Sequence, residues 1–331
     1  MLTTGSRPVR ALFRIAAGPR LGFGHLVRAR VLSRALGIER PLISLRGPVS
    51  AGASAKRLRM QLLSGTAAAL VARVRPEVLV LDDPSAVAAR PWCLAARRAG
   101  VPVASVHDLG TAFCGSDLAI DGSLVHPDRA RRAQDVPKTL LAGAEYAVLD
   151  GRVRTEPRRR HRRSPVLIAL GGGPRRSVAQ KLALALREAR PSLRVRVAGG
   201  LVPIAGDARQ GIAWLPPQPG LARELARCRV AVTGGGLSLY EAATLGAAVV
   251  AWPVVRAQYP TVKAFDRRGL AAAILPGPRR VARAVEAILA AVDAPMPSVA
   301  RARAVGLDGR GAMRVAAAVA RLARTTQEAR A

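Results

Sequence analysis

The chain of 331 residues carries a formal net charge of +32, and half of its residues are apolar. This length and apolar content are enough for two domains with sizeable cores. Arginines interrupt each apolar run before it reaches the roughly 18 residues of a membrane-spanning helix, and no signal-peptide core precedes a small-residue cleavage site. We therefore expect a cytoplasmic protein. Three widely spaced cysteines, Cys93, Cys114 and Cys228, predict neither a zinc site nor a disulfide framework.

The positive charge raises the hypothesis of a nucleic-acid partner. Nearly all of it comes from arginine, and alanine, glycine and proline are also abundant, a bias that a GC-rich coding sequence explains equally well. Aromatic residues for base stacking make up only 3% of the chain. We expect no specific nucleic-acid partner. The one dense run, RRRHRR at 158–163, predicts either a solvated linker or a peripheral contact with an acidic membrane surface.

Apolar runs that read as strands alternate with helical patterns along both halves of the chain, which predicts an α/β protein with mostly parallel sheets. The expected strands of the first half lie at 12–17, 42–45, 78–82, 102–106 and 117–120, and those of the second at 166–170, 195–199, 230–233, 249–252 and 272–275. We expect a first domain over 1–150, an arginine-rich linker over 151–165, a second domain over 166–300 and a helical segment over 301–331 that packs on either domain.

The motif GFGHLVR connects the first expected strand to a helix. Gly22 and Gly24 form the turn, His25 stands at the helix start, and Arg28 follows one turn later. Ligands bind at such turns in open α/β sheets, because the free N–H groups of the helix start attract anions. The motif is not a dinucleotide fingerprint, since its third glycine would fall at Val27.

Two more glycine turns, 171–173 and 234–236, follow strands of the second half. The later one leads into a helix that carries Ser238 and Glu241, so that a phosphate could sit on its first amides. Glu241 is either the acceptor for a ribose diol or a carboxylate on the surface of the helix.

With these motifs the chain resembles the nucleotide-sugar hydrolases of pseudaminic acid synthesis and their spore-coat polysaccharide relatives, which belong with the MurG-like glycosyltransferases. The resemblance rests on GFGHLVR and GGGLSLYE and on further segments found in the same order: VASVHDLG, SDLAIDGS, LLAGAEYAVLD, LIALGGG and DGRGAMRV. It implies a GT-B fold, in which two Rossmann-like doubly wound domains face a cleft.

The resemblance also implies a function. A UDP-linked sugar of the 2,4-diacetamido-2,4,6-trideoxy type would bind in the cleft, and His25 would act as the general base that activates water, releasing UDP without a metal or other cofactor. A neutral imidazole can accept a proton at neutral pH, and a leaving diphosphate is stabilised by N–H dipoles. Gly235, Gly236 and Ser238 would hold the diphosphate, and Glu241 the ribose.

The remaining residues that the resemblance places at the substrate are Arg14, Gly22, Gly24, Arg28, Asp108, Gly172 and Gln258. The two arginines either balance the diphosphate charge or form structural ion pairs. Asp108 either contacts substrate or orients a base, the alternative being a capped strand end beside a structural His107.

Two positions depart from the family pattern. The family has an Asp followed two residues later by Tyr after the third strand, whereas this chain has Asp82, Asp83 and Pro84. The carboxylates predict either substrate contacts or a turn or helix cap. Ala257 replaces an Asn that precedes the glutamine of the second domain. Both losses concern the sugar rather than the nucleotide.

Three alternatives to hydrolysis therefore stay open. A MurG-like glycosyltransferase would use His25 as the base for an acceptor hydroxyl, and its basic surface would meet a membrane. A non-catalytic nucleotide-sugar binding protein would keep the nucleotide half alone, and a nucleic-acid binder is supported by charge only.

Overall fold

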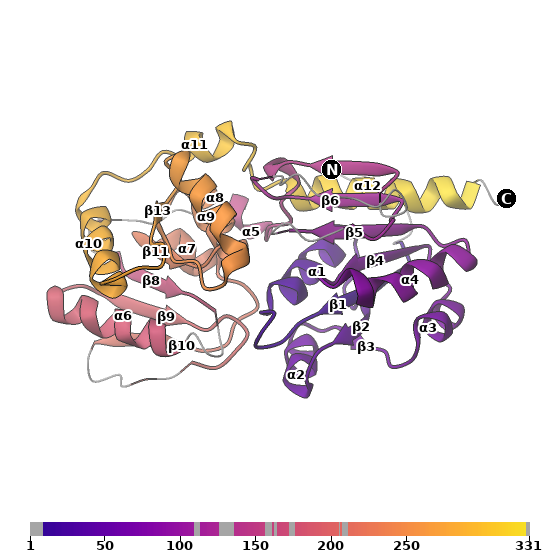
Figure 1. Ribbon diagram of the computed structural model, residues 1–331, viewed down its shortest axis with the longest axis horizontal. Helices are drawn as coiled ribbons and strands as arrows, with labels where there is room; N and C mark the ends of the chain where they lie inside the picture. Colours follow the sequence, from indigo (N-terminus) through magenta and orange to yellow (C-terminus); the bar gives the residue numbers. More distant parts are fainter. Residues whose placement is uncertain are drawn as a thin grey trace.

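The computed structural model describes residues 9–108, 113–125, 136–155, 161, 164–171, 176–204, 206 and 211–328. They form two units side by side, each built on a parallel sheet with helices on both faces (Figure 1). The α/β class expected from the sequence is confirmed. Most of the run at 158–163 lies outside the described residues, apart from His161.

The first unit contains a seven-stranded sheet in the order β3-β2-β1-β4-β5-β6-β7, with all neighbours parallel. Its strands are β1 (Ala11–Ala16), β2 (Leu42–Arg46), β3 (Gln61–Leu62), β4 (Val78–Asp82), β5 (Val103–His107), β6 (Leu118–Asp121) and β7 (Thr139–Ala142). Its helices are α1 (Gly24–Ala35), α2 (Val49–Arg57), α3 (Ala67–Val74) and α4 (Ala86–Arg98), followed by the 3-10 turn η2 (Ala144–Tyr146).

The second unit contains a six-stranded parallel sheet in the order β10-β9-β8-β11-β12-β13. Its strands are β8 (Val166–Ala169), β9 (Val195–Ala198), β10 (Ile212–Leu215), β11 (Val230–Thr233), β12 (Ala248–Ala251) and β13 (Ala272–Ala273). The helices are α5 (Arg152–Thr155), α6 (Arg176–Ala189), α7 (Ala222–Arg227), α8 (Leu237–Leu245), α9 (Tyr259–Arg267), α10 (Arg280–Asp293) and α11 (Val299–Ala304), with the 3-10 turn η5 (Arg256–Gln258).

All ten strands expected from the sequence are present, each within a few residues of its predicted bounds. Three further strands, β3, β7 and β10, were not predicted. Each stands at one edge of its sheet, and they are short or partly exposed, with Thr139 and Leu140 of β7 on the surface. An edge strand buries too little side chain to leave a continuous apolar run in the sequence.

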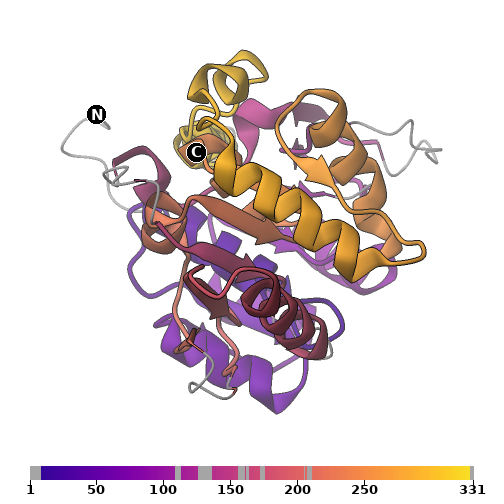
Figure 2. The ribbon, with the colours of Figure 1, turned by 90° about the vertical axis from the view of Figure 1, so that its left-hand side faces the viewer.

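Each sheet separates two cores. In the first unit α1 and α2 cover one face around Phe13 and Ile43, and α3 and α4 cover the other around Leu79. In the second unit α7, α8 and α9 cover one face, and α6 and α10 cover the other. Figure 2 shows the second unit from its outer side, with the first unit behind it.

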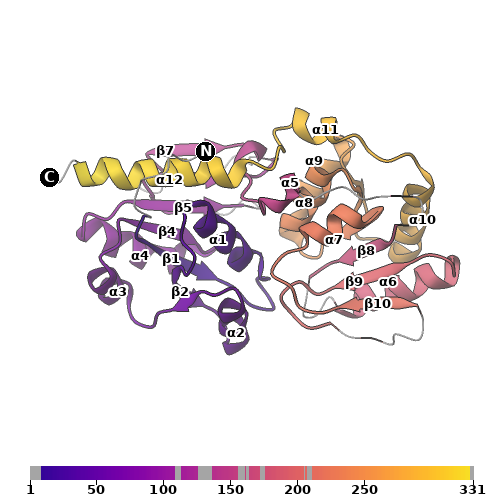
Figure 3. The ribbon, with the colours of Figure 1, turned by 180° about the vertical axis from the view of Figure 1, so that it is seen from behind.

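The chain passes between the two units twice. The segment expected as a linker begins instead with α5, whose Val153 is buried in the core of the second unit, where α5 contacts α7 and α8. The chain returns after α11, and the last helix, α12 (Gly311–Glu328), packs along α1 of the first unit. Figure 3 shows α12 beside the first sheet, far from α10 of the second unit.

The packing of α12 on the first unit can be tested at Val315. This side chain is 0% exposed in the first core, whereas Met313 on the same helix is 49% exposed. Val315→Ala removes two buried methyl groups and leaves a cavity, so we expect the free energy of unfolding to fall by about 2 kcal/mol.

Urea unfolding measures the change, with Met313→Ala as the matched control, which should stay within about 0.5 kcal/mol of the wild type. Equal stability of the two variants would contradict the described position of α12.

Candidate functional site

The candidate site lies between the two sheets, at the point where the order of the strands reverses in each. In the first sheet this point lies between β1 and β4, and in the second between β8 and β11. Ligands of open α/β sheets bind outside the carboxyl ends of the strands at such a point. Here both points open into one cleft, lined by residues of both units.

The glycine turn of the first unit brings His25 into this cleft. Gly18 and Gly22 exchange backbone hydrogen bonds of 3.1 and 2.7 Å, which close the loop after β1 into a tight hairpin. Gly22 has φ +87°, a left-handed conformation that favours glycine. Gly24 opens α1, and a Cβ built on it would lie 3.9 Å from Leu237 of the second unit. The two units therefore approach closely at the start of α1.

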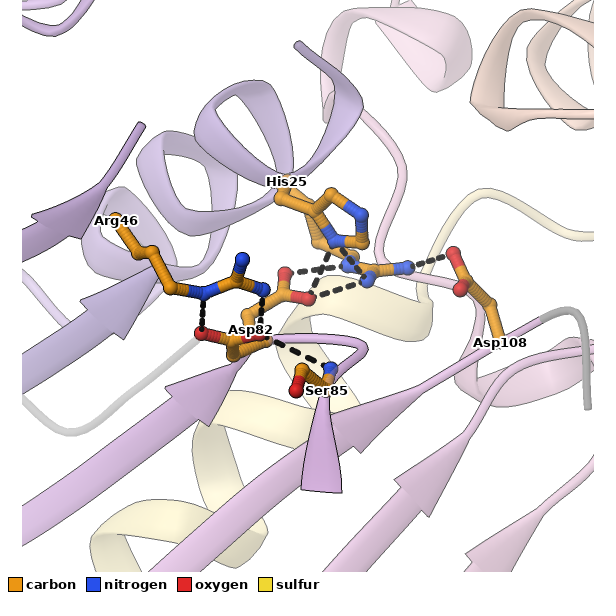
Figure 4. A network of polar contacts seen from close by, with 7 residues as sticks. His25, Arg46, Asp82, Ser85 and Asp108 are labelled. Carbon is orange, nitrogen blue, oxygen red and sulfur yellow. Dashed lines mark hydrogen bonds and ion pairs between the residues drawn. The ribbon is translucent and has the colours of Figure 1, made fainter. Parts of the chain in front are cut away.

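The imidazole of His25 is held by a carboxylate from another strand. Its Nδ1 lies 2.7 Å from Oδ1 of Asp82, which stands at the end of β4 (Figure 4). Nη2 of Arg28 also lies 3.0 Å from this Nδ1. Because an ionised carboxylate only accepts hydrogen bonds and lies closer, we assign the proton to Nδ1, which leaves Nε2 of the neutral ring as the proton acceptor. This is the arrangement of a general base with its orienting group.

Arg28 fixes the carboxylate in turn. Its Nε donates to Oδ2 of Asp82 at 2.7 Å, and its Nη1 donates to Oδ2 of Asp108 at 2.6 Å. Arg28 and Asp82 are both buried. Of the two roles expected for Arg28, the structure shows the ion pair. Asp108 lines the cleft and pairs with Arg28, and its charge also favours the protonated form of His25.

The network sets the protonation states of its members. Burial alone would raise the pKa of Asp82, but the adjacent cations Arg28 and His25 hold it well below its ordinary value. Burial disfavours the charged form of His25, yet the carboxylate of Asp82 outweighs this effect and raises the pKa of His25 above 6.5. Asp82 is therefore ionised at neutral pH, and the protonated form of His25 is more favoured than in a free histidine.

Arg14 and His107 are not among the residues that line the cleft. Arg14 donates to Oγ of Ser44 at 3.1 Å, stacks on Trp92 and faces Asp83. His107 is buried, with Nε2 2.7 Å from Oγ of Ser105, and it lines a smaller cavity together with Arg28 and Gly235.

The second unit presents the start of α8 to the cleft. Gly236 is its N-cap and makes no side-chain cap, so the first amides of the helix are open to an anion. Gly236 has open space where a Cβ would stand, whereas a Cβ on Gly235 would lie 2.6 Å from Gln258. Ser238 also lines the cleft, as does Gly171 at the end of β8. Gly172 lies outside the described residues.

Gln258 and Glu241 complete this side. Oε1 of Gln258 accepts a hydrogen bond from the backbone N–H of Val254 at 2.8 Å, which seats the side chain against the glycine turn. Glu241 lines the cleft but is only 4% exposed, so it is not a carboxylate on the helix surface. Its burial and the nearby Asp150 raise the pKa of Glu241 to about 7.

The structure brings together most of the residues singled out from the sequence: Gly22, Gly24, His25, Arg28, Asp108, Gly236, Ser238, Glu241 and Gln258 all line the cleft. The sequence predicted for Asp82 only a substrate contact or a cap, and not the contact with His25. Arg20 and Gln218 also line the cleft and were not predicted. A signal for Asp82 did exist, since it ends the strand expected at 78–82 and so shares an edge of the sheet with the turn that holds His25.

No helix among the described residues is long and apolar enough to cross a bilayer. Within the same part of the chain, no three His, Cys, Asp or Glu side chains group closely enough to hold a metal ion.

Comparison with known proteins identifies the fold. No protein-family model matches the chain, and no curated protein matches it in sequence. Among solved structures, the glycotransferase of kitacinnamycin has a TM-score of 0.65 at 16% identity, covering 96% of this chain and 100% of that one. MurG of Acinetobacter baumannii has a TM-score of 0.58 at 15% identity, covering 94% and 99%. The glycosyltransferase VinC, solved in complex with dTDP, has a TM-score of 0.61 at 13% identity, covering 96% and 100%.

The chain therefore has the GT-B fold of these glycosyltransferases, as the sequence predicts.

The buried carboxyl of Glu241 predicts a pH-dependent stability. Its pKa rises from an ordinary 4.5 to about 7 on folding, so the folded state binds the proton more tightly than the unfolded state. The contribution of Glu241 to stability is therefore fully present below pH 4.5 and is lost as the pH rises through 7. The loss amounts to about 3 kcal/mol, at 1.36 kcal/mol for each pKa unit.

Glu241→Gln should remove this dependence, so its stability relative to the wild type should increase between pH 5 and pH 8 in urea unfolding. Glu286→Gln, at an exposed position on α10, is the control and should show no such increase. A constant difference between Glu241→Gln and the wild type would contradict the burial of this carboxyl.

The contact between His25 and Asp82 predicts a measurable shift in a proton titration. In the wild type the pKa of His25 should lie above 6.5, and Asp82→Asn should lower it because the compensating charge is lost while the burial remains. NMR titration of the imidazole resonances measures this, with the signal of His25 assigned by its absence in His25→Gln. The same pKa in Asp82→Asn and wild type would show that the two side chains are apart in solution.

Proposed function

We propose that the protein is a nucleotide-sugar glycosyltransferase, which moves the sugar of a nucleoside diphosphate sugar to an acceptor hydroxyl with His25 as the general base. The observation that carries the proposal is the opposition of two chemically different walls in one cleft. One wall presents His25 with its orienting Asp82, and the other presents the uncapped start of α8 above the buried Glu241.

The second unit binds the nucleoside diphosphate. The diphosphate lies on the open amides of Gly236, Leu237 and Ser238, where the helix dipole favours negative charge. The ribose hydroxyls donate to Glu241, which lines the cleft one turn further along the same helix. The amide of Gln258 lies against the glycine turn and is within the same wall of the cleft.

The first unit supplies the general base for the sugar transfer. The acceptor hydroxyl gives its proton to Nε2 of His25 while its oxygen attacks the anomeric carbon of the sugar. The bond between that carbon and the diphosphate oxygen breaks, and its electron pair leaves with the diphosphate, whose charge the α8 amides stabilise. Asp82 stabilises the imidazolium that forms, as the orienting carboxylate of a base does. The solved GT-B structures that share the fold carry the names of glycosyltransferases, which favours this reaction.

Hydrolysis of a UDP-sugar is the second candidate, supported by the motifs shared with the hydrolases of pseudaminic acid synthesis. The same pair of His25 and Asp82 would then take the proton of a water molecule, and the free sugar and UDP would be the products. The two reactions differ only in the attacking oxygen, so the identity of the product distinguishes them.

The proposal predicts that the protein releases nucleoside diphosphate from a UDP- or dTDP-sugar. We expect His25→Ala to lower turnover by about 10²- to 10⁴-fold, as the loss of a general base does, and to leave the Kd for UDP within about twofold. His161→Ala, at an exposed position, is the control. In the wild type, turnover should rise with pH through the raised pKa of His25, because only the neutral imidazole accepts a proton.

The reaction is run in ¹⁸O-labelled water with and without a panel of hydroxyl acceptors. A sugar attached to the acceptor supports transfer, whereas a free sugar with ¹⁸O at the anomeric carbon, formed equally fast without acceptor, supports hydrolysis instead. Full activity of His25→Ala would refute the assigned base. Failure of both UDP and dTDP to bind would overturn the proposal as a whole.

A further inference from the structure

A basic hollow lies at the edge of the first unit, away from the cleft. It receives cationic side chains from three segments: the second half of α1, the loop before β2 and the end of α2 with the turn after it. The cationic residues are Arg30, Arg34, Arg40, Lys56 and Arg59, and one acidic residue, Glu39, lines the hollow with them.

The basic hollow and the cleft share no lining residue. The loops that precede β2 and β3 border the hollow, so it lies at the amino ends of the strands, whereas the cleft lies at their carboxyl ends. Helix α1 connects the two places, with His25 in its first turn and Arg34 in its last. At 1.5 Å per residue these two positions are about 14 Å apart along the helix. A ligand in the hollow is therefore distinct from the substrate of the cleft.

The positive charge of the hollow is poorly compensated. Between Leu26 and Pro76 the chain has ten lysines and arginines but a single carboxylate, that of Glu39. Nη1 of Arg30 donates at 2.6 Å to the backbone oxygen of Glu39 rather than to its carboxylate. The pKa of Arg30 is lowered, first by burial and then by the cations of Arg34 and Arg59. The arginines of the hollow therefore repel one another.

The favourable interaction of a cation with the end of a helix explains only some of the cations in the basic hollow. Arg34 lies in the last turn of α1 and Lys56 in that of α2, where each offsets a helix dipole of about half a charge. Arg59 lies beyond α2 with φ +58°, a left-handed conformation that residues with a side chain rarely adopt. An arginine thus occupies a backbone position that suits glycine, and its side chain lines the hollow with the others.

We propose that the basic hollow is a binding site for a ligand that carries several phosphate groups. Guanidinium groups pair with phosphate oxygens through two parallel hydrogen bonds, and they stay charged when partly buried. Arg30 and Arg34, one turn apart on α1, present two such groups on one face of the helix. A ligand of this kind neutralises the repulsion among the arginines, and it goes beyond the proposed function because the cleft takes no part.

Two sources supply this chemistry, namely a membrane surface, where several acidic phospholipids present one phosphate each, and a soluble oligophosphate. The test compares the double variant Arg34→Gln/Arg59→Gln with Arg73→Gln/Arg98→Gln. The second pair removes the same charge from exposed positions of the same unit outside the hollow. Each protein is titrated with inorganic tripolyphosphate and is sedimented with vesicles of phosphatidylcholine, with and without phosphatidylglycerol.

We expect wild type and the Arg73/Arg98 variant to bind alike, and the Arg34/Arg59 variant to bind at least about tenfold more weakly, since two charge-assisted contacts are lost. If the weakening appears with tripolyphosphate alone, the source is soluble. If it appears with the acidic vesicles as well, the source is the membrane.

Equal weakening in the two double variants would mean that only net charge matters, and would overturn the proposal. Tripolyphosphate binding that is unchanged by Arg34→Gln/Arg59→Gln would place the anion elsewhere, including the cleft, and would overturn it too. Neither result depends on whether the protein uses a nucleotide sugar, because UDP binding and turnover are measured separately.

Discussion

The buried guanidinium of Arg28 holds two carboxylates from different strand ends, and the geometry of the first wall of the cleft depends on it. Asp82 and Asp108 both accept from this one side chain. Without the cation, two neighbouring carboxylates would repel each other, and the buried Asp82 would take up a proton rather than stay charged. His25 would then lose the acceptor that orients its ring. Removing one partner of such a buried network costs about 3–5 kcal/mol, so the arginine supports folding and site geometry together.

The two units contribute different kinds of electrostatics to the cleft. The first contributes charged side chains whose states are set by direct contact, whereas the second contributes backbone dipoles at the start of α8 and a carboxyl that burial makes easy to protonate. Side-chain charges suit a group that must exchange a proton. Fixed amides suit a group that must receive negative charge without moving, because they cost no reorganisation. The two kinds of group meet because the strand order of each sheet reverses at the edge that faces the cleft.

Much of the architecture could be predicted from the sequence, because parallel strands buried on both faces leave continuous apolar runs and glycine turns mark their ends. GFGHLVR and GGGLSLYE could be placed at strand ends for the same reason, and the resemblance to a known family placed them at one cleft. The partner of His25 could not be predicted with equal force. Asp82 is 57 residues away in the sequence, and only the adjacency of β1 and β4 brings it within 2.7 Å. The position of α12 could not be predicted either, because its apolar face would fit both units. Only the structure shows that the chain returns to the first unit.

The return of α12 to the first unit has a consequence for the order in which the protein forms during synthesis. Domains fold as units while the chain emerges from the ribosome, in general the amino-terminal one first. Here the core around Phe13 and Leu26 includes Val315 and Val319 of α12, so it stays open until the last helix has emerged. The second unit, continuous from α5 to α11, has all its own strands long before that moment. We therefore expect the core of the first unit to be completed last, after the strands of the second unit have emerged.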